Sequence, residues 1–177
     1  MFEHPLPATC KPLKLARQEG RLSGFMPLKR LTALVEDCVD VADEDRVNAK
    51  LAFSLSENRP EVHGQAQASV KLVCQRCLEP VTVNLNVSMA LGFVQNEEQA
   101  KALPEYLEPF LFEEEEVPLS CLLEQELILA LPIVAYHQGC DPISFDGGEA
   151  VRESKVEKPN PFAVLEQLKG HVKKSDS

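Results

Sequence analysis

The chain has 177 residues and a formal net charge of −10 at pH 7, and 44% of its residues are hydrophobic. This length allows one domain with a sizeable core, and the composition is typical of a soluble globular protein. The sequence contains neither an apolar run long enough to span a membrane nor a secretory signal, so we expect a cytoplasmic protein. Its six cysteines are too scattered to form a disulfide scaffold.

The charge is unevenly distributed along the chain. Residues 1–30 carry six Lys or Arg and two Glu, a net charge of +4. Residues 31–157 carry a net charge of −16, and residues 158–177 carry +2. An acidic body repels phosphate, which disfavours a broad nucleic-acid-binding surface. The basic ends could contact RNA locally or be ordinary solvated segments.

The N-terminal part, residues 1–40, is predicted to be mainly helical. We expect two short helices at residues 11–20 and 28–37, separated by a connecting segment at residues 22–27. A first strand follows at residues 47–55, because apolar and polar side chains alternate there.

The central segment is predicted to form an antiparallel hairpin whose tip carries two cysteines. Apolar and polar residues alternate over residues 65–72 and again over residues 81–91. Between these two runs lies a Cys-x-x-Cys motif, formed by Cys74 and Cys77, which contains Arg76. Together with the preceding strand, this hairpin gives an antiparallel meander.

A helix at residues 118–131 is predicted to cover the apolar face of this sheet, since its leucines recur at helical spacing and Pro132 ends it. Four glutamates at residues 113–116 precede the helix, where they stabilise it through its dipole. The predicted fold class is therefore α+β: an antiparallel β-sheet, a meander with a central Cys-x-x-Cys hairpin, covered by α-helices. One domain is expected over residues 1–137, with its sheet at residues 45–93.

The composition changes after the covering helix. Residues 138–158 are rich in Gly, Pro, Ser and charged side chains, which predicts a flexible linker. Residues 159–177 are expected to form a short helix and a tail, because Pro161 fits the first position of a helix. Phe162 and Leu165 lie on the apolar edge of this helix. Pro161, Phe162 and Leu165 are therefore candidate partner-binding residues, and the helix would dock either on its own domain or on a partner.

The cysteines at the hairpin tip are candidate metal ligands or reactive thiols. Structural zinc takes four ligands, and His137 and Cys140 repeat the two-residue gap of the tip. Cys74, Cys77, His137 and Cys140 would form a Cys3His zinc site if the fold brings the two pairs together. Free thiols in a structural loop and a redox pair are the alternatives, although redox pairs usually open a helix and do not join strands. Arg76 between the thiols could contact a phosphate.

Three motifs occur in order along the chain. They are LVCQRC at residues 72–77, ELILALPIV at residues 126–134 and KPNPFAVL at residues 158–165. In this order, and with an acidic middle and a short basic tail, the chain resembles the bacterial YceD family of large ribosomal RNA subunit accumulation proteins. The resemblance covers nearly the whole chain. It implies a cytosolic, non-enzymatic factor needed for the synthesis, processing or stability of 23S rRNA.

The function expected from the sequence is that of an accessory factor in large-subunit biogenesis. The expected partner is the pre-50S ribosomal particle, through 23S rRNA, basic ribosomal proteins or both. No enzyme and no small-molecule substrate are expected, because the sequence contains no phosphate-binding glycine-rich loop and no nucleophile elbow. Two alternatives stay open: a small zinc- or thiol-dependent redox protein, and an acidic adaptor that binds only proteins.

Overall fold

The computed structural model describes residues 4–143 of the chain. The predicted C-terminal helix, with Pro161, Phe162 and Leu165, lies outside the described residues, as does most of the predicted linker. The described part combines a mainly antiparallel sheet with short helices, so the predicted α+β fold class is confirmed.

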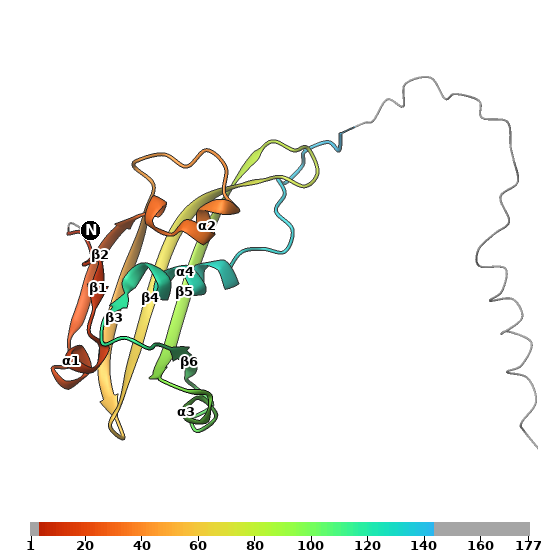
Figure 1. Cartoon of the computed structure of the whole chain (residues 1–177). Coiled ribbons are helices and arrows are strands. Elements are labelled where there is room, and N and C mark those ends of the chain that lie inside the picture. Colours follow the sequence, from red (N-terminus) through yellow and green to blue (C-terminus); the bar gives the residue numbers. More distant parts are fainter. Residues whose placement is uncertain (1–3, 144–177) are drawn as a thin grey trace, which may run out of the picture. The chain divides into compact units, whose positions relative to one another are not determined.

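A five-stranded sheet forms the centre of the fold, with the strands in the order β2-β3-β4-β5-β6 (Figure 1). Neighbouring strands are antiparallel except β5 and β6, which are parallel. A second sheet of two strands pairs β1 with β7. The strand bounds are Thr9–Cys10 (β1), Arg21–Pro27 (β2), Arg46–Ser56 (β3), Arg59–Val73 (β4), Pro80–Val94 (β5), Glu108–Leu111 (β6) and Val117–Pro118 (β7).

The predicted hairpin is confirmed in both its strands and its tip. β4 pairs with β5 from Glu61 opposite Gly92 to Val73 opposite Pro80, which leaves residues 74–79 as the connecting loop. The other end of β4 joins β3 through Glu57 and Asn58, both in the left-handed region with φ values of 48° and 66°. Such a two-residue turn matches the natural twist of a hairpin.

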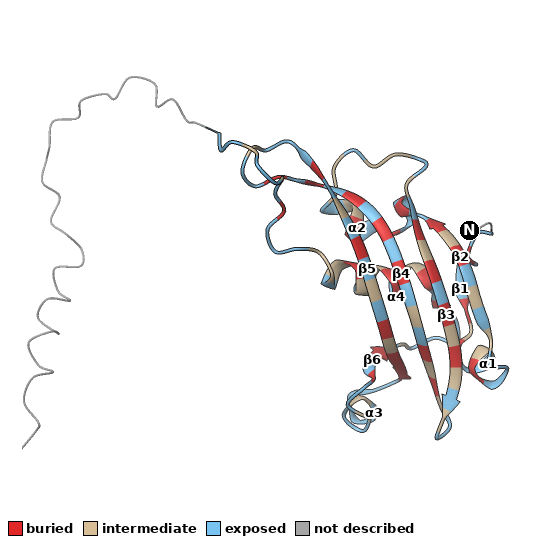
Figure 2. Ribbon diagram, turned by 180° about the vertical axis from the view of Figure 1, so that it is seen from behind, coloured by how far each residue is buried: buried red, intermediate tan, exposed pale blue. Residues whose placement is uncertain are grey.

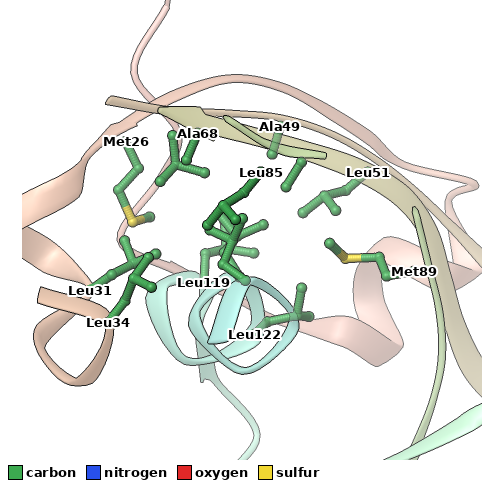
Figure 3. Close-up of a cluster of buried hydrophobic side chains, with 14 of the residues drawn as sticks. Met26, Leu31, Leu34, Ala49, Leu51, Ala68, Leu85, Met89, Leu119 and Leu122 are labelled. Carbon is green, nitrogen blue, oxygen red and sulfur yellow. The ribbon is translucent and has the colours of Figure 1, made fainter. Parts of the chain in front are cut away.

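Helices cover one face of the large sheet, and α4 lies across the strands on that face (Figure 1). Leu119, Leu122, Leu123 and Leu127 of α4 are fully buried. Ala49 and Ala68 on adjacent strands present small side chains to this helix, which leaves room for its leucines (Figure 3). The helix bounds are Pro12–Arg17 (α1), Leu28–Arg30 (η1, a 3-10 turn), Thr32–Glu36 (α2), Glu97–Lys101 (α3) and Leu119–Leu129 (α4).

Both short helices predicted for the N-terminal part are present, as α1 and as η1 with α2, but the prediction that this part is mainly helical was wrong for the segment between them. The segment expected to connect two helices is instead the edge strand β2, which pairs with β3 from Arg21 opposite Ala52 to Pro27 opposite Arg46. Its inward positions include Gly24, whose missing side chain lets the chain near His4 approach closely. Glycine and proline in this strand mask the alternation that would have revealed it, because both residues are usually turn formers.

Within the described residues, no helix combines the length and the apolar character needed to cross a lipid bilayer.

Candidate metal centre

The loop at the hairpin tip folds back on itself so that two cysteines lie at its base. The Cys74 N–H donates to the carbonyl of Glu79 at 2.9 Å, and the Leu78 N–H donates to the carbonyl of Cys74 at 2.9 Å. Leu78 has a φ of 62°, in the left-handed region that costs an ordinary residue energy. The sharp turn places the Cys74 and Cys77 thiols on the same side of the loop.

The segment that follows α4 runs along this loop and is hydrogen-bonded to it at both ends. The Gln75 N–H donates to the carbonyl of Ala135 at 2.8 Å, and the Ile143 N–H donates to the carbonyl of Arg76 at 3.1 Å. We call residues 135–143 the tip-binding segment. Its backbone contacts are with the loop itself, so the segment is positioned by the hairpin tip.

These contacts bring together the four predicted ligands, Cys74, Cys77, His137 and Cys140. Their ligand atoms all lie within 4.8 Å of one another, which allows the group to hold a metal ion. The two Sγ atoms of Cys74 and Cys140 are 3.7 Å apart, and the Sγ atom of Cys77 is 3.4 Å from Nδ1 of His137. Tetrahedral zinc with bonds of about 2.0–2.3 Å places its ligand atoms roughly 3.5–3.8 Å apart. The donor set and its spacing therefore fit a tetrahedral metal.

The hydrogen bonds of His137 leave the correct ring nitrogen available for a metal. Its Nε2 atom lies 3.1 Å from the carbonyl of Pro80, which can only accept. Nε2 therefore carries the proton, and Nδ1 keeps its lone pair on the side of the cysteines. Orientation of a ligand histidine by a backbone carbonyl is a common feature of metal sites.

The environment of Cys74 favours its thiolate. Burial raises its pKa, but the N–H groups of Cys77, Arg76 and His137 surround the sulfur and together lower the pKa to about 5. By contrast, burial and the neighbouring Cys74 and Cys77 sulfurs raise the pKa of Cys140. A cation bound between this thiolate and the two further thiols would neutralise the negative charge of Cys74.

Sequence reasoning missed four exposed apolar side chains in the tip loop, at the end of α4 and in the segment that follows it. Ile133 is 97% exposed, Leu129 is 75% exposed, and Tyr136 and Leu78 are each about 60% exposed. Leu129 is the last residue of α4, and Ile133 and Tyr136 lie between it and His137. In this stretch the helical spacing stops but apolar residues continue. We call Leu78, Leu129, Ile133 and Tyr136 the apolar strip. Clusters of large exposed apolar residues are typical of interaction surfaces.

Arg76 is exposed at the tip, and its carbonyl accepts the bond from Ile143. A phosphate contact from its side chain stays a prediction.

Comparison with known proteins identifies the family. The family described as "Large ribosomal RNA subunit accumulation protein YceD" matches residues 62–169. A protein of the same description from Haemophilus influenzae is 37% identical over 169 residues, which cover 93% of this chain and 96% of that protein. The chain belongs to the YceD family. No solved structure was found to match it. The family match spans both halves of the candidate metal centre, because the hairpin tip and the tip-binding segment both lie within it.

Proposed function

We propose that this protein is a non-enzymatic factor that supports the synthesis, processing or stability of 23S rRNA during biogenesis of the large ribosomal subunit. The observation that carries this proposal is membership of the YceD family, whose name refers to accumulation of large ribosomal subunit RNA. Its place of action would be the cytoplasm, and its partner the pre-50S particle.

We further propose that the tip cluster binds zinc as a structural ion. Cys74, Cys77, His137 and Cys140 would be its ligands, and zinc would supply a cross-link between the hairpin tip and the tip-binding segment. The donor set of three sulfurs and one imidazole is typical of structural zinc sites, in which all four positions are filled by protein. A full set of protein ligands leaves no position for a substrate, which favours a structural role.

A redox function is the second candidate, and one observation favours it. The pKa of Cys74 is lowered to about 5, and its sulfur lies 3.7 Å from that of Cys140. Reactive thiols, however, need access to solvent or substrate, and Cys74 is fully buried. The fourth residue of the group, His137, also has no role in a simple dithiol pair.

The apolar strip provides the surface for a protein contact. It lies beside a fixed segment, so its side chains are presented in one arrangement and lose little freedom on binding. The acidic body would attract a basic ribosomal protein to this surface, since opposite charge accelerates association. A protein-only adaptor would use the same strip, so crosslinking to RNA in cells distinguishes the two functions.

The test uses a bacterial strain that lacks its own YceD-family gene. We expect the wild-type chain to raise the amount of 23S rRNA relative to small-subunit rRNA. An unchanged ratio would contradict the proposed function. Metal analysis of protein purified without chelator, together with thiol titration, separates zinc from redox chemistry. One zinc per chain with protected thiols supports the structural ion, whereas metal-free protein with a reversible disulfide supports the redox alternative.

A further inference from the structure

The face of the large sheet opposite α4 is uncovered by helices in the described part of the chain (Figure 2). Over most of β3, β4 and β5, buried or half-buried positions on the side of α4 alternate with exposed or half-buried positions on the other side; at the end of β5, Gly92 and Val94 are buried on that other side, where Leu103 lies over Gly92. We call this second side the outer face. Antiparallel sheets commonly leave one face solvated, and the kind of side chain on that face then decides what it can bind.

Amides and hydroxyls dominate the outer face. In register across the three strands, Asn48 lies opposite Gln67, which lies opposite Asn86. The adjoining position pairs Gln65 with Ser88, and Ser69 pairs with Asn84. The outer-face residues in the central part of these strands are Arg46, Asn48, Lys50, Gln65, Gln67, Ser69, Lys71, Thr82, Asn84, Asn86 and Ser88.

The charge of the outer face is opposite to that of the protein. The set contains three basic residues, Arg46, Lys50 and Lys71, and no carboxylate. Among the described strand residues that point the same way, Glu61 is the acidic one, and it lies towards the far end from the tip. Its side chain is 12% exposed and accepts a bond from Ser54 at 2.9 Å. A positive surface on a chain with a net charge of −10 would orient a polyanion towards this side.

The outer face also carries a flat stacking element at its β2 edge. The guanidinium carbon of Arg46 lies 4.3 Å from the centre of the Phe25 ring, and Phe25 is paired with Asn48. Beside Arg46, a shallow hollow of about 400 Å³ is lined by Asn48, Gln67, Asn84 and Asn86 among others. Planar arginine and aromatic groups provide surfaces on which unpaired bases stack.

We infer that the outer face binds single-stranded RNA, with Arg46, Lys50 and Lys71 at the phosphates and the amide row of Asn48, Gln67 and Asn86 at base edges and ribose hydroxyls. Amide side chains offer a donor and an acceptor together, which matches the edge of a base. This inference rests on the proposed function only for the source of the RNA. An acidic protein segment would also match the positive charges and the amides, but it brings no bases to stack on the Arg46–Phe25 element, so RNA fits the face better.

The test measures binding of the full chain to a labelled single-stranded RNA of mixed sequence over a range of salt concentrations. The variant R46Q/K50Q/K71Q removes three positive charges from the outer face. We expect its affinity at 0.1 M salt to fall roughly 100-fold, and its plot of log affinity against log salt to become less steep by about 2. The matched control K14Q/R17Q/K101Q removes three exposed charges from α1 and α3, outside the central part of this face, and should bind as the wild type does.

A second variant separates base contacts from charge and guards against misfolding of the first. Q67A/N86A should weaken binding roughly tenfold while leaving the salt dependence unchanged, because neutral contacts release no counterions. Equal losses in the charge variant and its control would overturn the inference, as would unchanged binding in the charge variant. Self-association through this face, seen as a dimer that the charge variant abolishes, would also overturn it.

The outcome is distinguishable from failure of the proposed function. If the wild-type chain restores the rRNA ratio in cells but binds no RNA, the inference fails and the proposed function stands. If the chain binds RNA through the outer face but leaves the ratio unchanged, the proposed function fails and the inference stands.

Discussion

Removal of the proposed zinc ion gives the most informative test of the metal centre. A ligand that binds only the folded chain stabilises it according to its free concentration relative to the dissociation constant, by about 4 kcal/mol at a thousandfold excess. For a domain of this size, each kcal/mol changes the melting temperature by about 2–4 °C. We therefore expect chelation to lower the melting temperature by about 10 °C.

The structure also predicts where the effect appears first. The metal would join Cys77 to His137, which are 60 residues apart in the chain. Without it, the tip-binding segment keeps the backbone bonds from Gln75 to Ala135 and from Ile143 to Arg76, each worth about 1 kcal/mol. Bonds of this strength hold a short segment only weakly, so limited proteolysis of the metal-free protein should cut first at residues 130–143.

Two cysteine variants complete this test. Cys140→Ser removes one ligand and should abolish stoichiometric zinc and reproduce the loss of thermal stability seen with chelator. Cys121→Ser is the matched control, because Cys121 is an exposed free cysteine outside the cluster. The reasoning is refuted if both variants melt at the same temperature and bind the same amount of metal.

Four further substitutions test the fold and the C-terminal segment. Gly24→Ala should destabilise the protein by about 1–3 kcal/mol in chemical denaturation, because its Cβ would clash with the carbonyl oxygen of His4. A variant as stable as the wild type would show that the chain near His4 moves away from β2 at little cost. Leu122→Ala should cost about 2–5 kcal/mol by the same measurement, whereas Leu129→Ala on the exposed side of α4 should cost less than 1. Phe162→Ala should impair rRNA accumulation with a melting temperature close to that of the wild type, and a large fall in melting temperature would instead place Phe162 in a core.

The hairpin and its cover could be predicted from the sequence because both have strong periodic patterns. Alternation extends over most of β4 and β5, and the leucines of α4 recur on one face, so local sequence and final packing agree. β2 could not be predicted, because glycine and proline usually favour turns. In this strand Gly24 instead lets the chain near His4 approach closely, and Pro27 lies at the end of the strand. Only the pairing with β3 reveals the strand.

The metal centre could be predicted as a set of residues but not as a site. Two pairs with the same two-residue gap suggested Cys74, Cys77, His137 and Cys140, yet the long separation between the pairs lies outside compact zinc motifs. The link between them is tertiary, because α4 crosses the sheet and delivers the tip-binding segment to the hairpin loop. Sequence spacing carries no signal for such a crossing.

The outer face was hidden by the averaging of charge along the sequence. Acidic residues of the body lie in connecting segments and helices, such as residues 113–116, 97–98 and 36–45, while the middle of the sheet carries basic and amide residues. A linear sum over residues 31–157 gives −16 and suggests that the body repels RNA. Alternation in the strands then gathers the basic and amide residues on one side of the sheet, since successive residues point to opposite faces. An acidic protein can therefore contact RNA with one face and a basic protein with the rest of its surface.

The outer face and the apolar strip would offer two separable contacts, one on the sheet and one at the hairpin tip and the end of α4. Lys71 and Thr82 are paired near the tip end of β4 and β5, and Leu78 of the apolar strip lies in the loop that joins these strands. A zinc ion at the tip would fix the strip relative to the sheet, so RNA on the face and protein on the strip would be held in one mutual geometry. Loss of the ion should then weaken simultaneous binding of RNA and protein more than it weakens the binding of either one alone. The reason is that two linked contacts increase the overall affinity only when both can form at the same time.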